Sequence, residues 1–108
     1  IALPLYMRAN GASSNLSPAL GVDGVFSFAA AADDGGGTGL ALVSGSKTAP
    51  TLHVYAERSG TWTRLFETGL REIPYRLTLA AGPTRLVVGI AYREPTGYAV
   101  EGLVLPLR

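Results

Sequence analysis

The 108-residue chain carries nine Lys and Arg and eight Asp and Glu, a formal net charge of +1, which excludes a nucleic-acid-binding protein that relies on neutralising many phosphates. It has no cysteine and a single histidine, which excludes disulfides and thiolate chemistry and leaves no metal-ligand spacing. Only 16% of the residues are charged and 47% are hydrophobic, so we expect neighbouring subunits to cover part of an uncharged surface.

Strand signals run through the whole chain, which is short enough to form one domain over residues 1–108. Gly and Pro recur at intervals of about 8 to 12 residues, between runs rich in Val, Leu, Thr and aromatic residues. About eight short strands are predicted, near residues 2–9, 24–31, 38–44, 51–57, 61–67, 75–80, 84–93 and 98–105. The pattern favours an all-β fold, an antiparallel β-sandwich that is jelly-roll-like, with an immunoglobulin-like sandwich and a small barrel as alternatives.

The first and last predicted strands have similar sequences, because each is an apolar run interrupted by one proline. Proline cannot donate to a sheet ladder, so such strands normally lie at sheet edges, where chains add partners. We therefore predict that both runs form edges and that at least one engages another chain. The candidate assembly residues are Leu3, Pro4, Leu5, Leu105, Pro106 and Leu107.

Residues 10–23 form the least regular segment of the chain. Their mixture of Ser, Asn, Gly and Pro predicts either a crossover loop between two sheets or an irregular arm that lies on a neighbouring molecule.

Alternation and turn residues define the second half of the chain. Over 84–93 the large apolar residues share one face, and over 51–57 Leu52, Val54 and Ala56 share one face against His53, Tyr55 and Glu57. Hairpin turns are predicted at 33–37, 59–60 and 95–97, with a tight connection at 82–83. Tyr75, Leu77 and Leu79 are predicted to point to the core.

Tyr55 and Trp62 stand on either side of the predicted 59–60 hairpin, with His53 beside Tyr55. On a shared outer face they would form a flat aromatic platform of the kind on which sugars stack. Core packing is the alternative, because Trp62 alternates with Arg64 and Phe66.

The inventory of reactive side chains does not support catalysis. A nucleophile and its base would have to be built around His53 alone, which we expect to be an exposed strand histidine. The glycine-rich run at 33–39 fits no phosphate-binding motif. We therefore predict no catalytic, cofactor-binding or metal-binding residues, and no apolar run is long enough for a membrane partner. Glutamates interspersed among the arginines of the second half favour a mixed solvated face over an acidic-ligand site.

The opening Leu3-Pro4-Leu5-Tyr6-Met7 is similar to the short L-P-L-[F/Y] strands of structural proteins in tailed bacteriophages, particularly tail and virion-surface components. The closing Leu103-Val104-Leu105-Pro106-Leu107 resembles the same kind of segment. The resemblance implies a virion module of sandwich or jelly-roll type that assembles symmetrically and has no catalytic residues to carry over.

Two functions from different classes are therefore predicted. The first is a non-enzymatic structural or assembly module, a phage capsid decoration or tail component, whose partners are other subunits in a homo-oligomer or virion lattice. The alternative is a carbohydrate-binding or adhesin module that uses the aromatic hairpin to bind a surface glycan. Either would act in the virion or outside the cell, without nucleic acid, membrane or cofactor.

Overall fold

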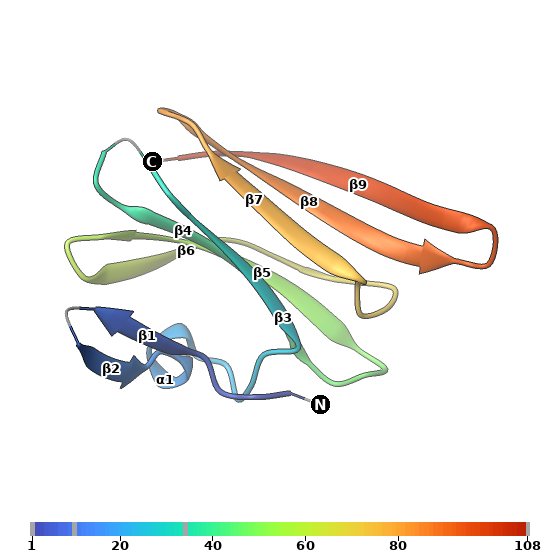
Figure 1. The fold of residues 1–108 in the computed structure, drawn as a ribbon, viewed down its shortest axis with the longest axis horizontal. Helices are drawn as coiled ribbons and strands as arrows, with labels where there is room; N and C mark the ends of the chain where they lie inside the picture. Colours follow the sequence, from blue (N-terminus) through green and yellow to red (C-terminus); the bar gives the residue numbers. More distant parts are fainter. Residues whose placement is uncertain (1, 10, 34, 108) are drawn as a thin grey trace.

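The computed structural model describes residues 2–9, 11–33 and 35–107. Over these residues the chain forms nine strands and one short helix (Figure 1). In chain order the elements are β1 (Tyr6–Ala9), β2 (Ala12–Asn15), α1 (Ser17–Leu20), β3 (Ser27–Ala32), β4 (Thr38–Gly45), β5 (Pro50–Arg58), β6 (Thr61–Gly69), β7 (Arg76–Ala81), β8 (Arg85–Glu94) and β9 (Gly97–Pro106). The all-β prediction is confirmed.

The strands form three antiparallel sheets, ordered β1-β2, β3-β4-β5-β6 and β7-β8-β9. In Figure 1 the four-stranded sheet lies in the middle, with β7 to β9 on one side and the N-terminal elements on the other. Strand order follows the chain within each described sheet, so each is a meander, whereas a jelly roll is built from two Greek keys. The expected jelly-roll order does not appear in these sheets.

The hairpin turns lie where the sequence predicts them. Ser59 and Gly60 join β5 to β6 with φ angles of 52° and 85°; glycine adopts such a value without steric cost, and positive φ at both central residues is typical of a tight hairpin turn. In the turn between β3 and β4, Asp33 Oδ1 accepts hydrogen bonds from the N–H groups of Gly35 (2.7 Å) and Gly37 (3.1 Å) and pairs with Arg58 at 3.0 Å. These bonds, that from Gly37 above all, lower the pKa of the Asp33 carboxyl.

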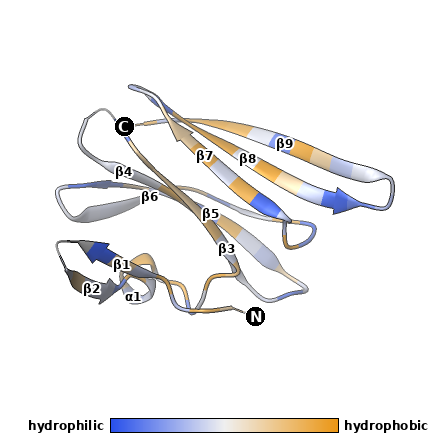
Figure 2. Ribbon diagram, viewed as in Figure 1, coloured by the Kyte–Doolittle hydropathy of each residue, from blue (hydrophilic) through white to orange (hydrophobic). Residues whose placement is uncertain are grey.

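The main core joins the two larger sheets. Its buried side chains come from β4 and β5 on one side and from β7 and β8 on the other: Ala41, Val43, Leu52, Val54, Leu77, Leu86, Val88, Ile90 and Tyr92. Bands of hydrophobic and hydrophilic residues alternate along β7 to β9 (Figure 2), as expected of strands that bury one face. The predicted core face of residues 84–93 is confirmed.

A second core covers the opposite face of β4 and β5. Leu40, Leu42 and Tyr55 project from the sheet, and the covering residues Leu5, Leu20, Val22 and Val25 come from the N-terminal segment. Consecutive residues of β4, from Leu40 to Ser44, are therefore all buried. The expectation that β5 has one polar, exposed face is wrong for Tyr55, which this N-terminal layer covers, and for His53, which is also buried.

The segment predicted to be irregular, residues 10–23, contains β2 and α1 over its described part, 11–23. It packs on its own chain: the Ser17 Oγ accepts a hydrogen bond from the Leu5 N–H at 3.1 Å. Helix α1 is only four residues long and ends at Gly21, whose φ of 73° provides the left-handed cap. Over its described part the segment therefore holds short regular elements and connects the β1-β2 sheet to the sheet that begins with β3.

The Tyr55 hydroxyl donates a buried hydrogen bond to the Leu20 carbonyl at 2.8 Å, which fastens the N-terminal layer to the central sheet. Tyr55→Phe removes the donor and leaves a buried carbonyl without a partner, so we expect the free energy of unfolding to fall by ~1–3 kcal/mol. Urea denaturation measures the change, and Tyr6→Phe, at an exposed ring, is the matched control. Equal stability of the two variants would contradict the assignment.

Candidate functional site

The predicted aromatic platform is not formed at the surface. Tyr55 is only 3% exposed and His53 only 8%, and their rings lie nearly parallel with centroids 6.1 Å apart. Trp62 packs against the second core. The prediction of an exposed platform is wrong for Tyr55 and His53, and the alternative of core packing describes their positions.

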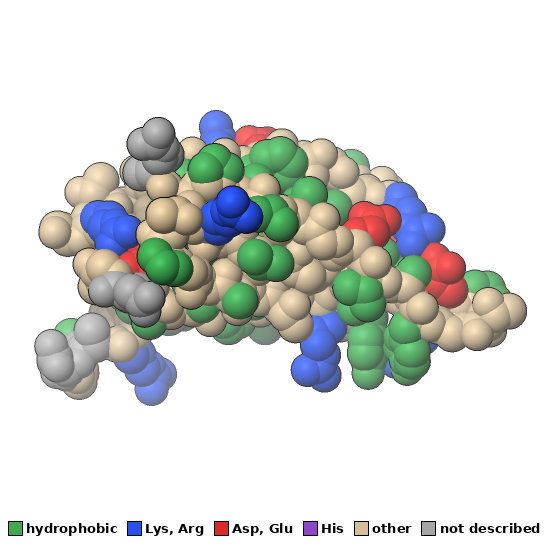
Figure 3. All heavy atoms as spheres, turned by 90° about the horizontal axis from the view of Figure 1, so that it is seen from above, with side chains coloured by type: hydrophobic (Ala, Val, Ile, Leu, Met, Phe, Trp, Pro, Cys, Tyr) green, Lys and Arg blue, Asp and Glu red, His purple; other side chains and the backbone are tan. Residues whose placement is uncertain are grey.

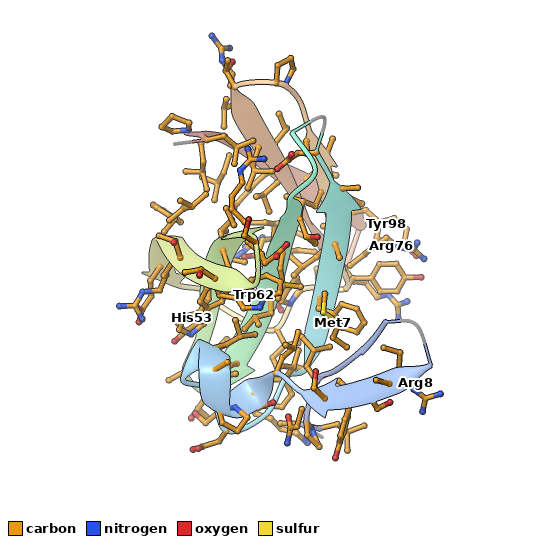
Figure 4. The ribbon with its side chains drawn as sticks, turned by 90° about the vertical axis from the view of Figure 1, so that its left-hand side faces the viewer. Met7, Arg8, His53, Trp62, Arg76 and Tyr98 are labelled. Carbon is orange, nitrogen blue, oxygen red and sulfur yellow. The ribbon has the colours of Figure 1, made fainter. Side chains whose placement is uncertain are left out.

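His53 is a buried titratable residue whose imidazole lacks a hydrogen-bond partner among the described residues. Its Nδ1 is buried without a hydrogen-bond partner there and lies 3.9 Å from Glu67 Oε1; Figure 4 labels its position beside the central sheet. Burial lowers the pKa of the imidazole; Glu67 raises it in part, and Arg64 lowers it further. His53 is therefore not the exposed strand histidine that was expected.

The two proline-marked ends have different structures. At the C-terminus, Pro106 ends β9, the outer strand of its sheet, so the predicted edge is confirmed there. At the N-terminus, Leu3 makes one isolated bridge with Val25 and Leu5 is buried in the second core. Leu3 and Pro4 are exposed and only Leu5 is buried, and these residues do not form the edge strand that was predicted.

The free side of β9 can be assigned residue by residue. The Leu107 N–H donates to the Thr84 carbonyl at 2.8 Å, and antiparallel residues alternate between facing the neighbouring strand and facing away from it. Odd-numbered residues of β9 therefore bond to β8. The even-numbered ones direct their backbone groups to the free edge, from Tyr98 to Pro106, with Pro106 offering only its carbonyl.

The side chains of these even-numbered residues lie on the outer face of the sheet. Val104 pairs with Val87, and Val100 pairs with Ala91. Val100 is 73% exposed and Val104 is 59% exposed. Figure 3, which views the molecule from above, shows hydrophobic side chains exposed between a few charged ones. Val100 and Val104 therefore place exposed apolar side chains beside the free edge.

The outer strands elsewhere in the two larger sheets are less open. The pairing of β6 with β5 carries a register shift between Val54 and Tyr55, and its surface holds the Arg64–Glu67 ion pair at 3.0 Å. Strands β3 and β7 contact each other. Bulges, charges and covering elements are the usual ways to block an edge, so β9 is the long open edge among the described strands.

A groove of about 510 Å³ lies between the N-terminal segment and the start of β7. Its walls are Leu3, Pro4, Leu5, Val25, Phe26, Ser27, Phe28, Tyr75, Arg76 and Leu77. Phe28 is 55% exposed and Tyr75 is 50% exposed. This volume falls in the range of small-molecule sites.

An aromatic cluster supports the Tyr75 wall of the groove. The Tyr98 ring lies with its centroid 5.4 Å from that of Tyr75, and the Arg93 guanidinium sits 4.5 Å from the Tyr75 ring centroid. In Figure 4, Arg76 and Tyr98 project from the same side of the molecule as Arg8. The groove is therefore flanked by aromatic rings and cations.

Sequence reasoning missed this groove. It placed Tyr75 on the core face with Leu77, yet Tyr75 precedes β7 and its ring is half-exposed. The preceding Pro74 is the local signal, because proline favours the start of a strand and interrupts its alternation. No local sequence pattern predicts that three distant segments, 3–5, 25–28 and 75–77, come together in the fold.

Among the described residues, no His, Asp and Glu side chains gather in a group of three that could hold a metal ion. The described part of the chain also has no helix of the length and apolarity that a membrane crossing needs. No protein-family model matches the chain, and no curated protein or solved structure matches it either.

The lowered pKa of His53 predicts how stability depends on pH. The unfolded chain takes up a proton near pH 6.5, whereas the folded chain does so only at lower pH. The unfolded state therefore binds more protons below about pH 6.5, and we expect the free energy of unfolding to fall as the pH decreases from about 7.5 to 5.5. Urea denaturation at several pH values should show a shallower dependence for His53→Gln. Identical slopes for both proteins would refute this origin.

Proposed function

We propose that the protein is a non-enzymatic assembly module that joins copies of itself through the free edge of β9. One observation carries the proposal: β9 is a ten-residue outer strand whose single charged residue is Glu101. Long apolar edges bind further strands readily, and soluble monomers usually protect them with charges or bulges. The exposed Val100 and Val104 beside this edge would be buried on association.

Two copies related by a two-fold axis can pair their β9 strands antiparallel. The even-numbered residues face the free edge, so the axis can pass through Gly102, the middle of residues 98–106. That register opposes Val100 to Val104 of the second copy and overlaps the whole edge. An axis at Glu101 would oppose two carboxylates, which is unfavourable.

The finer features of the proposal rest on separate observations. The core shared by β4, β5, β7 and β8 supports a β-sandwich, in which two sheets pack face to face. The role as a phage capsid decoration or tail component, in the virion or outside the cell, rests on the L-P-L resemblance and stays a prediction.

The carbohydrate-binding alternative loses its first support, because the hairpin aromatic Tyr55 is buried and fixed by its bond to Leu20. Any glycan site would have to use other aromatic residues.

Replacing Val100 and Val104 together by Lys tests the assembly. In the Gly102 register each new lysine would oppose a lysine of the second copy, so we expect the oligomer to become monomeric, as measured by light scattering coupled to size exclusion. Both side chains are exposed, so folding should be preserved. Lysines at Thr61 and Thr63, exposed on β6, are the matched control. A monomeric parent, or an oligomer that survives the Val100 and Val104 change, would overturn the proposal.

Gly102→Cys tests the register. No other part of the chain lies within 4 Å of an added Cβ at Gly102, so the side chain can be accommodated. In the proposed dimer the two cysteines face each other across the axis, with Cα atoms about 5.5 Å apart. Mild oxidation should give a disulfide-linked dimer on a non-reducing gel, whereas Val87→Cys, on the same face but in β8, should not. Equal crosslinking of both variants would contradict the Gly102 axis.

A further inference from the structure

The groove between the N-terminal segment and β7 combines two features that suit ligand binding. Two aromatic rings, Phe28 and Tyr75, are half-exposed along its walls. Arg76 lies on the same wall and forms no ion pair with any carboxylate of the described residues. Aromatic surface beside an available guanidinium suits a ligand that is both flat and anionic.

The aromatic wall is held in place before any ligand arrives. Tyr75 packs on one partner, the Tyr98 ring, and is capped by a second, the Arg93 guanidinium. Holding the ring in this way reduces the conformational entropy that a ligand must overcome on binding. The cluster thus fixes Tyr75 as a rigid wall of the groove, with one face of its ring covered by Arg93.

The charge around the groove is positive. Arg93 also forms no ion pair with the described carboxylates, while its neighbour Glu94 is bonded to Arg71 at 2.7 Å, away from the groove. Because the Arg93 guanidinium already lies over the Tyr75 ring, Arg76 is the cation of the groove wall that remains available to an anion.

A ligand in the groove finds few free backbone groups with which to form hydrogen bonds. Leu3 and Val25, both on the wall, already exchange hydrogen bonds with each other (3.1 and 2.7 Å). The outer side of β3 lies against β7. A peptide could not readily add there as a strand, so recognition must come from side chains, through stacking and charge.

We propose that this groove binds an acidic sugar chain. A uronic acid offers both required groups: the C–H face of its ring stacks on Phe28, and its carboxylate pairs with the Arg76 guanidinium, which can make two parallel hydrogen bonds. The site goes beyond the assembly function, because none of the residues that line the groove belongs to β9, although Tyr98 of β9 packs on Tyr75 from behind the wall.

Calorimetric titration with two acidic probes, oligogalacturonate and oligomannuronate, tests the proposal. At least one should bind, and its affinity should fall about tenfold or more in Arg76→Gln and several-fold in Phe28→Ala. Arg85→Gln is the matched control, since Arg85 is also exposed on the three-stranded sheet but lies outside the groove. The affinity of this control should equal that of the parent protein.

Two further probes separate stacking from charge alone. Methyl-esterified oligogalacturonate keeps the sugar rings and removes the carboxylates, and a poly-glutamate peptide keeps the carboxylates and removes the rings. Each should bind at least tenfold more weakly than the acidic oligosaccharide. The proposal is overturned by failure of both acidic probes, by an equal loss in Arg85→Gln, or by poly-glutamate binding as tightly, which would assign the groove to an acidic peptide.

Discussion

The burial of β4 and β5 on both faces is the constraint on which the other layers of the molecule depend. One face of these strands completes the core with β7 and β8, and the other is covered by the N-terminal segment. A strand exposed on one side tolerates polar residues there, but Leu40 to Val43 form an unbroken apolar run. Each covering layer is therefore needed to keep this surface from water, since burying apolar area is the main favourable contribution to folding.

The sequence predicted the features of the fold that depend on neighbouring residues, and it failed where contacts between distant residues decide. Strand β8 shows clean alternation because one face is buried and the other is in water, and its core residues were predicted correctly. Turns at Ser59-Gly60 and Pro95-Thr96 depend on neighbouring residues alone. The same pattern gave a wrong prediction for β5. His53 and Tyr55 are polar enough to predict a solvent-exposed face, but the N-terminal segment, which is distant in sequence, covers Tyr55. Helix α1 is too short to give a periodic pattern.

The two L-P-L runs show why a proline does not by itself define an edge. Pro106 ends a long strand paired with β8, and its backbone nitrogen faces the free edge, where no strand of the same chain needs a donor. Pro4 lies between the bridge at Leu3 and the buried Leu5, in a wall that only the folded chain assembles. Similar residues thus serve an edge in one case and a groove in the other, and the difference comes from contacts with residues 16–28 and 75–77.

The bond from Tyr55 to Leu20 also has a consequence for the order of folding. Each of the two larger sheets is a meander of neighbouring hairpins, so its contacts are close in sequence and need little loop closure. The N-terminal layer, by contrast, reaches across 35 residues to make this bond. Sequence distance thus favours a route in which the hairpins form early and the N-terminal layer docks last. Until it docks, one apolar face of β4 and β5 is exposed to water and prone to aggregation.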